Sequence, residues 1–312
     1  MNRFLDQSFA WLRIARLHFY PPVAVLYGLG AAAARALTGR FDGAACALGY
    51  AYLFLVGLAT SMSNEYFDHP SDAVNANAGP FTGGSRVLVD GRLGFRAVRA
   101  AILFAVAAAV LVSAALASSV PAGHRPALVA LVALGMLLAL GYTLPPFKLS
   151  YRGLGEIDVA FMHSTFVALL GYVVQTGDWR HPLPYLLSVP SFFAVLSAIT
   201  LAGIPDQAAD AAAGKRSWCV LFGRRTAATI ALLAAIAAGL AGVWLWSSGL
   251  VGAAGALFLL AAAHALALAA ALIRFIRSGA PEGRIDPLLV NALVFTLWFG
   301  VVPLMDFLRR LR

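Results

Sequence analysis

The chain contains repeated apolar stretches, and this pattern leaves few folds open to it. A helix needs about 20 apolar residues to cross the hydrocarbon core of a bilayer. The composition agrees, because 61% of the 312 residues are hydrophobic and only 12% are charged. We therefore predict an all-α membrane protein with one integral-membrane domain over residues 1–312, built around a central cavity that opens to the cytoplasm. Its nine predicted transmembrane helices cover residues 18–37, 44–63, 97–119, 125–142, 157–176, 183–203, 226–247, 250–273 and 288–308.

The distribution of basic residues predicts the orientation of this bundle. In the nine-span layout, 16 of the 23 lysines and arginines fall on the side of the N-terminus and seven fall on the other side. Cytoplasmic loops are enriched in Lys and Arg, so the N-terminus and the long loops are predicted to face the cytoplasm from the cell (inner) membrane. The odd number of spans then leaves a basic C-terminus outside, against the same rule. The charges are scattered between spans, which argues against a nucleic-acid partner, and no segment indicates an obligatory protein partner.

The first polar motif lies where the span from residue 44 meets water. Asn64, Asp68 and Asp72 are spaced i, i+4, i+8, so a continuous helix would place them on one face. Amide and carboxylate oxygens are suitable ligands for a hard cation such as Mg²⁺. Pro70 disfavours a helical conformation at the residue before it. The helix is therefore predicted to end near Asp68, and Asn64 and Asp68 are stronger candidate ligands than Asp72.

A second acidic pair follows the span that ends near residue 203. Asp206 and Asp210 repeat the i, i+4 spacing. Unpaired carboxylates close to hydrocarbon are costly, so two such clusters are more typical of a functional site than of ordinary membrane helices. We predict a Mg²⁺ site in one cavity, although solvated loop charges in salt bridges are the simpler alternative. Its predicted ligands are Asn64, Asp68, Asp72, Asp206 and Asp210.

Each acidic motif is followed by glycine and by cationic residues. The glycine-rich segment 79–85 precedes Arg86, and Gly214 precedes Lys215 and Arg216. Glycines let backbone N–H groups approach an anion, and Arg binds phosphate with two parallel hydrogen bonds. The pattern indicates a metal–diphosphate site, with carboxylates on the metal and cations on the phosphates. For Arg86 and Lys215 taken alone, surface salt bridges are an equal alternative.

These motifs resemble the UbiA superfamily of intramembrane prenyltransferases. The first signature of that family has the form N-D-x-x-D-x-x-x-D, and residues 64–72 match it with Glu65 in the second position. The second signature matches residues 206–210 and the Gly-Lys pair that follows, but Ala211 stands where the family often has an Arg. Residues 142–156 look like the family's middle cytoplasmic segment. The resemblance covers nearly the whole chain, and it implies the same nine spans.

Within this superfamily, two segments look most like the menaquinone branch, which prenylates 1,4-dihydroxy-2-naphthoate. They are residues 82–88 and 171–177. His163 and Ser164 depart from the small apolar residues expected at their positions, which hints at a divergent acceptor. The resemblance thus implies an isoprenyl diphosphate and an aromatic quinone precursor as substrates, in lipoquinone (menaquinone) biosynthesis, with Mg²⁺ as cofactor.

The resemblance also implies roles for individual residues. Metal-bound Asp68 and Asp206 would activate the diphosphate, and an aromatic face, Tyr142 or Tyr66, would stabilise the allylic carbocation. Glu156 or Asp158 would act as the base or would position the acceptor; for Glu156, pairing at a helix start is an equal alternative. The residues expected to bind the diphosphate are Arg86, Lys148, Lys215 and Arg216.

Two other functions share some of these features. A lyase or terpene cyclase of the same fold would ionise a prenyl diphosphate without an aromatic acceptor, using the same metal-binding groups. A transporter is a further alternative, because acids within membranes also mark ion pathways. Against a transporter, the acidic motifs all lie at one face, and none lies in the middle of the membrane.

Overall fold

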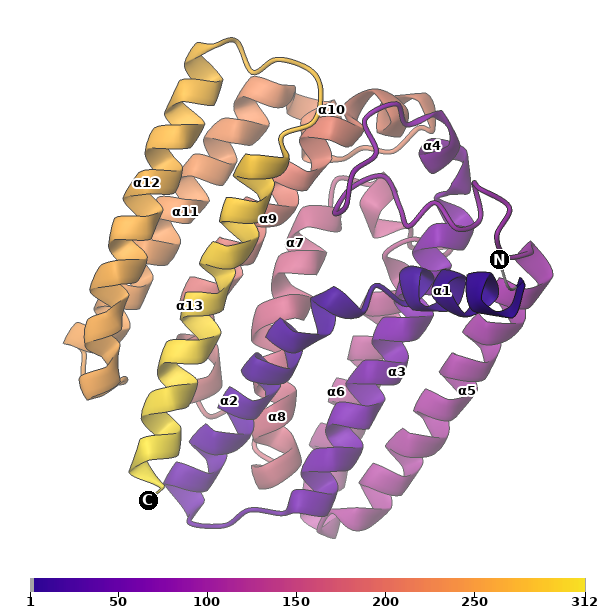
Figure 1. The fold of residues 1–312 in the computed structure, drawn as a ribbon. Helices are drawn as coiled ribbons and strands as arrows, with labels where there is room; N and C mark the ends of the chain where they lie inside the picture. The colour runs from indigo at the N-terminus through magenta and orange to yellow at the C-terminus, as the bar shows by residue number, and fades with distance from the viewer. Residues whose placement is uncertain (1–2, 312) are drawn as a thin grey trace.

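The computed structural model describes residues 3–311, with side chains described from residue 6 on; residues 1, 2 and 312 of the predicted domain lie outside it. All regular secondary structure in the described residues is helical, with no strand, which confirms the predicted all-α class (Figure 1). The α-helices are α1 (Arg3–Ala15), α2 (Tyr20–Thr38), α3 (Gly43–Phe67), α4 (His69–Val74), α5 (Phe95–Ser119), α6 (Arg125–Gly141), α7 (Gly155–Phe161), α8 (Val167–Thr176), α9 (Leu183–Ala212), α10 (Trp218–Phe222), α11 (Arg224–Ser247), α12 (Phe258–Arg277) and α13 (Asp286–Arg310). Short 3₁₀ segments cover Leu17–Phe19, Ala122–His124, Leu149–Tyr151 and Ala253–Leu257, and a π-helix covers Met162–Phe166.

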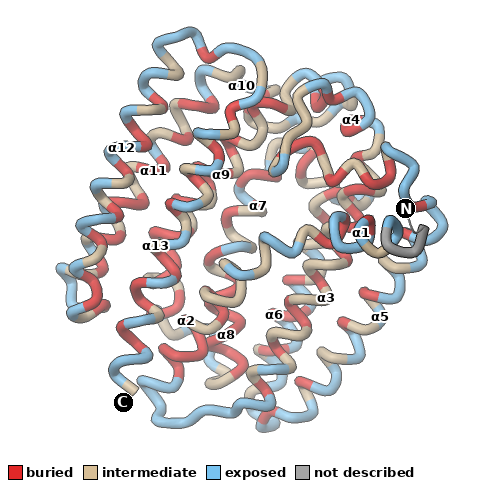
Figure 2. The backbone as a smooth tube through the Cα atoms, viewed as in Figure 1, coloured by how far each residue is buried: buried red, intermediate tan, exposed pale blue. Residues whose placement is uncertain are grey.

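Nine helical segments of residues 3–311 are long and apolar enough to cross a membrane, as predicted. In the fifth segment, α7, the π-helix and α8 form one continuous span. Large apolar side chains are exposed along the outer faces of α5 and α12, for example Phe104 (75% exposed), Leu111 (71%) and Leu266 (69%). Buried positions face the other helices (Figure 2). Lipid would cover the exposed apolar side chains, so the chain is an integral membrane protein.

The sixth span is longer than predicted. α9 continues to Ala212 instead of ending near residue 203, so Asp206 and Asp210 lie on its last turns and not in a loop. The alanine-rich sequence after Pro205 has a high helix propensity, which explains the extension. The connection from α9 to α11 is correspondingly short and contains α10.

The third helix breaks where Pro70 predicts a break. α3 ends at Phe67, and α4 begins at His69 with Pro70 in its first turn. Proline is tolerated in a first turn, because the N–H group it lacks would have no partner there. After α4, a glycine-rich loop crosses the end of the bundle and leads to α5 (Figure 1). Asn64 therefore stands on α3 and Asp72 on α4, on either side of the break.

The centre of the bundle is held by a close crossing of α2 and α8. A Cβ atom added at Gly30 would overlap the backbone carbonyl of Ala168, and one at Gly171 would overlap that of Tyr27. Small residues at such a crossing let two helices approach closely in lipid. As a result, the span that contains α7 and α8 is the most buried of the nine.

The two ends of the bundle differ in character. α4, α10 and the N-terminal α1 gather at one end, whereas the C-terminus and the α2–α3 connection lie at the other (Figure 1). α1 lies across its end of the bundle and packs Ala10 and Ile14 against Ala59 and Met62 of α3. Both acidic motifs are at this same end, as their positions on α3, α4 and α9 require.

Candidate active site

A pocket of about 150 Å³ lies at the end of the bundle that holds α4 and α10. Side chains from α3, α4, α7 and α9 and from the connecting loops line it. All five predicted metal ligands line this one pocket, together with three of the other predicted residues. They are Asn64, Asp68, Asp72, Asp206 and Asp210, with Tyr142, Glu156 and Lys215.

The first motif presents Asp68 to several partners. One carboxylate oxygen, Oδ1, accepts a hydrogen bond from the Tyr151 hydroxyl at 3.1 Å. The other, Oδ2, forms an ion pair with the Lys215 ammonium at 2.9 Å. Asn64, one turn earlier, accepts a hydrogen bond from the Thr143 hydroxyl at 3.0 Å. Asp68 is thus already charge-compensated by a residue that follows the second motif.

Asp72 is different, because its carboxylate is buried without a hydrogen-bond donor among the described residues. Burial and, to a smaller extent, the nearby Asp68 carboxylate raise the pKa of Asp72 to about 7. The backbone of Gly84, which has a φ of +73°, lies directly against this carboxylate, and a Cβ atom there would overlap it. A bound cation would favour the ionised form of Asp72.

The second motif is fully hydrogen-bonded. Asp206 accepts from the Asn75 amide at 2.7 Å and from the backbone N–H of Gly83 at 3.2 Å. Asp210 accepts from the Ser217 hydroxyl at 3.1 Å. Asn75 and Gly83 belong to the loop after the first motif, so this loop holds the second motif in place.

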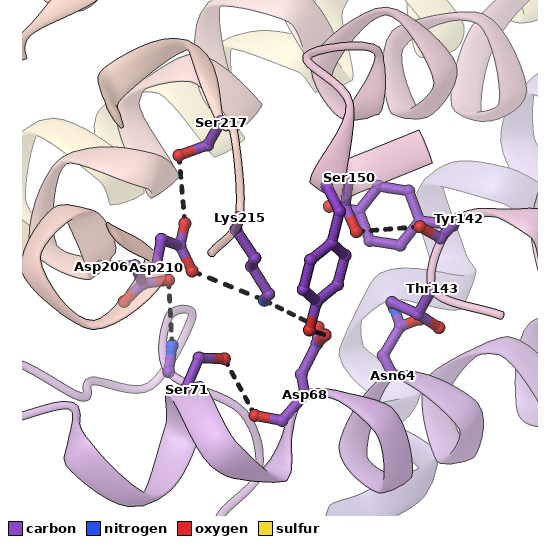
Figure 3. A network of polar contacts seen from close by, with 12 residues as sticks. Asn64, Asp68, Ser71, Tyr142, Thr143, Ser150, Asp206, Asp210, Lys215 and Ser217 are labelled. Atoms are coloured by element: carbon purple, nitrogen blue, oxygen red, sulfur yellow. Dashed lines mark hydrogen bonds and ion pairs between the residues drawn. The ribbon is translucent and has the colours of Figure 1, made fainter. Parts of the chain in front are cut away.

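Lys215 joins the two motifs. Its ammonium lies between Asp68, at 2.9 Å, and Asp210, at 3.5 Å (Figure 3). Burial acts to lower the pKa of Lys215, but the attraction of the two carboxylates outweighs burial and leaves the pKa above its ordinary value. The pocket therefore already accommodates a positive charge between a carboxylate of each motif.

The carboxylate and amide oxygens of this pocket suit Mg²⁺ ions that are also coordinated by a substrate. Within residues 3–311, no three Asp, Glu, His or Cys side chains come together closely enough to hold one metal ion. Mg²⁺ is usually held by one or two carboxylates, with water and substrate phosphates completing its coordination. The carboxylates of the two motifs lie on either side of Lys215. This arrangement suits Mg²⁺ ions that also bind a diphosphate better than it suits a metal site made of protein ligands alone.

The other predicted cations lie outside the pocket lining. Arg86 donates a hydrogen bond to the backbone carbonyl of Asp72 at 3.0 Å. The Lys148 ammonium lies 4.4 Å from the centre of the Tyr151 ring, and Arg216 is exposed. Their predicted contacts with a diphosphate stay predictions.

Glu156 lines the pocket and also makes the helix-start contact that was its alternative role. Its Oε1 atom accepts a hydrogen bond from the backbone N–H of Trp218, at the start of α10, at 2.6 Å. Asp158 is absent from the lining of the described pocket, and its buried Oδ1 has no partner among the described residues.

The two candidate tyrosines are also separated. Tyr142 lines the pocket, and burial raises the pKa of its hydroxyl well above the ordinary value, which keeps that hydroxyl neutral. Tyr66 packs against Phe67 and Phe95, away from the pocket lining.

Several residues of the site were missed by the sequence analysis. Arg16 lines the pocket but was counted only as a charge that sets orientation. Asn75 and Tyr151 contact the acidic motifs from separate loops, and their sequence contexts carry no periodic signal. Glu65 accepts hydrogen bonds from the backbone N–H groups of Ser85 and Leu88, so the carboxylate at this position anchors the glycine-rich loop.

Comparison with known proteins now decides the family. The model of the UbiA prenyltransferase family matches residues 23–304, nearly the whole chain. The chain belongs to this family. It is therefore a prenyltransferase with the family's helical membrane fold. No curated protein matches the chain.

Solved structures similar to this UbiA-family enzyme share its fold along its whole length. A UbiA homolog from Archaeoglobus fulgidus bound to GPP and Mg²⁺ has a TM-score of 0.61 and 15% identity, over 96% of this chain and 99% of that one. The structure of a digeranylgeranylglyceryl phosphate synthase has a TM-score of 0.60 and 14% identity, over 98% of this chain and 99% of that one. At such identities the likeness shows the fold alone.

Proposed function

We propose that this enzyme transfers a prenyl group from an isoprenyl diphosphate to an aromatic quinone precursor like 1,4-dihydroxy-2-naphthoate, in menaquinone biosynthesis and with Mg²⁺. One observation carries the proposal: a single pocket gathers both acidic motifs and Lys215 at the end of an apolar bundle. That a UbiA homolog with this fold is described as bound to GPP and Mg²⁺ supports the choice of substrate and metal.

The acidic residues and Lys215 would act on the leaving group. Mg²⁺, when bound with the diphosphate, neutralises charge on the oxygen that leaves as the allylic C–O bond breaks. Asn64, Asp68 and Asp72 would hold metal on one side of the pocket. Asp206 and Asp210 would do so on the other. Lys215 would move from the carboxylates to the phosphate oxygens, where its charge stabilises the departing diphosphate.

Additional cations are proposed for the diphosphate itself. Arg16 already lines the pocket. Arg86, Lys148 and Arg216 stand on the surrounding loops and are proposed to add positive charge around the phosphates. Such charge would be most valuable as the C–O bond breaks, when negative charge builds up on the leaving group.

The apolar side of the pocket would serve the carbocation and the acceptor. Ile199, Ala202 and Gly203 of α9 line it below the carboxylates and would keep water from the cation. The ring of Tyr142 would face the allylic cation, because an aromatic face attracts positive charge. Glu156 is proposed to orient the acceptor or to take up the proton that the ring loses after the new C–C bond forms.

We further propose that the pocket faces the cytoplasm from the cell membrane. It lies at the end of the bundle that carries α1, and the loops at this end contain most of the basic residues. The positive-inside tendency supports this orientation. Both substrates would then meet at the cytoplasmic surface, with the prenyl tail in the bilayer.

A turnover assay tests the function. Purified enzyme in nanodiscs would be given a radiolabelled allylic diphosphate, with and without Mg²⁺ and with and without 1,4-dihydroxy-2-naphthoate. We expect diphosphate release and a prenylated ring only when both metal and acceptor are present. Metal-dependent release without an acceptor would show a lyase instead. If folded protein releases no diphosphate under any condition, the proposed substrates are wrong, and a transporter becomes the alternative to test.

A further inference from the structure

One histidine is exposed inside the most buried span of the bundle. His163 lies in the π-helix Met162–Phe166, between α7 and α8, in the span Gly155–Thr176. Its side chain is exposed, although the following residues Ser164, Phe166 and Val167 are buried. A polar side chain at this depth is costly unless it has a function or a partner.

The exposure of His163 does not come from a lipid-facing stripe of the helix. Residues three and four positions away share its face. Ala160, Phe166 and Val167 are buried, and Val159 is half-buried. The exposed large apolar residues at this end of the span are Leu154, just before α7, and Ile157 of α7, which point in another direction because they are nine and six positions away. The exposure of His163 is therefore local and does not belong to an exposed face of the span.

The hydrogen bond of His163 defines which ring nitrogen is available. Nδ1 lies 3.2 Å from the carbonyl oxygen of Val159, which can only accept, so Nδ1 carries the proton. In the neutral ring, Nε2 then carries a lone pair and no proton. No other hydrogen bond of His163 is formed with the residues that the structure describes. Short π-helical segments often occur at functional sites, and this one carries an exposed histidine whose Nε2 can still accept a hydrogen bond.

His163 lies close to residues that border the active-site pocket. Ile199 lines that pocket on α9 and packs in one apolar cluster with Ala160 of α7. Ala160 is one helical turn before His163, and the π-helix itself packs against α9. On α7, Glu156 lines the pocket seven residues before His163, which corresponds to about 10 Å along the helix axis. His163 thus lies on the membrane side of the pocket, on the same face of the span as Glu156.

We propose that Nε2 of His163 accepts a hydrogen bond from a hydroxyl group on the acceptor ring. This inference rests on the proposed function and deepens it, because it names a residue that binds and orients the acceptor. Of the groups brought to this site, an ionised diphosphate has only acceptor oxygens and a prenyl chain has no polar hydrogen. Only a hydroxyl on the acceptor offers a proton to the lone pair of Nε2. His163 binds and orients the ring and takes no part in breaking the C–O bond.

Binding of matched ligands tests this role directly. Wild-type enzyme in nanodiscs, with Mg²⁺ and the non-ionising analogue geranyl S-thiolodiphosphate, would be titrated with 4-hydroxy-2-naphthoate and with 4-methoxy-2-naphthoate, in which the group at C4 is too far from the carboxylate to bond with it. The methoxy compound cannot donate a hydrogen bond. We expect the hydroxy compound to bind about tenfold more tightly in the wild type, as the loss of one buried hydrogen bond implies. His163→Leu should bind both compounds with equal affinity, and His163→Gln, which retains an acceptor oxygen, should keep part of the preference.

Control variants and the turnover assay separate the possible outcomes. His264→Leu removes another histidine from a membrane span, one that bonds Asn291 and Trp298 instead, and it should keep the wild-type preference. A full preference in His163→Leu would overturn the role of His163. The role of His163 would also be overturned if the wild type transfers prenyl groups to the naphthoate but binds the two ligands equally well. This comparison uses only wild-type protein, so it does not depend on the folding of a variant. A wild type that neither binds nor prenylates any naphthoate would overturn the proposed acceptor as well.

Discussion

The two acidic motifs have the same i, i+4 spacing but are built differently. The first is divided at Pro70, so that Asn64 stands on α3 and Asp72 on α4. The second lies on the uninterrupted end of α9. Asp206 and Asp210 have hydrogen-bond donors, whereas the buried carboxylate of Asp72 has none among the described residues. The same spacing thus yields one pre-organised pair and one cluster that still needs a cation.

The motifs also depend on each other. The loop after the first motif supplies Asn75 and Gly83 to Asp206, and the loop after the second supplies Lys215 to Asp68. Such exchange keeps both motifs at one pocket, although the chain between them crosses the membrane several times. It also means that each contact can be broken separately and its effect on either motif measured.

The largest effect is expected from removing one carboxylate of each motif. Asp68→Ala and Asp206→Ala should each lower turnover at least about 100-fold, because each removes a proposed metal ligand from the pocket. Asp178→Ala, in an exposed loop remote from the described pocket, is the matched control and should stay near wild type. Prenyl transfer in folded protein is the measurement. Activity above about a tenth of the wild-type value in either variant would contradict the assignment.

Removing Lys215, which links the motifs, should lower the stability of the protein as well as its turnover. Lys215→Gln leaves Asp68 and Asp210 buried without their cation, and breaking such a pair costs about 3 kcal/mol. The midpoint of thermal unfolding should fall by several degrees, and Mg²⁺ with inorganic diphosphate should restore more of it than in the wild type. Lys148→Gln, which breaks no ion pair of the described residues, is the control. If Mg²⁺ with diphosphate does not raise the lowered unfolding midpoint of Lys215→Gln, a metal ion does not take the place of the Lys215 ammonium.

The role of Asp72, whose carboxylate lacks a hydrogen-bond donor among the described residues, can be tested at Gly84. Gly84→Ala would press a methyl group onto the Asp72 carboxylate, whereas Gly91→Ala introduces the same left-handed strain with no atom within 4 Å of the new group. The strain alone costs about 1 kcal/mol in both variants. We expect the Mg²⁺ concentration for half-maximal turnover to rise about tenfold in Gly84→Ala only. Equal shifts in the two variants would show that Asp72 is not involved.

The smallest effect is expected from removing one hydrogen bond to Asp206 in the second motif. Asn75→Ala removes one of two hydrogen bonds to Asp206, and the remaining bond from Gly83 should hold the carboxylate in place. Turnover should fall about fivefold, as one hydrogen bond implies. Asn77→Ala, which loses only a long contact of 3.4 Å to the Pro205 carbonyl, should change little. A loss in Asn75→Ala as large as in Asp206→Ala would mean that the motif is not pre-organised.

The sequence by itself determined the all-helical class and the number of membrane spans. Helix length and apolar content are local properties, so nine spans could be counted without any knowledge of their packing. The break near Asp68 was also predictable, because proline restricts its immediate neighbours. The end of α9 was not, since alanine-rich sequence permits a helix to continue past Gly203 without requiring it.

Only the tertiary structure decided which of these residues meet. Asn75 lies 131 positions from Asp206, and no periodicity relates the two. The pairing of Lys215 with Asp68 was likewise not predictable from the sequence. Nor were the position of Lys148 and Arg216 outside the pocket lining and the exposure of His163. Contacts between distant residues depend on how the helices pack and where the loops cross, and local sequence patterns carry no information on either.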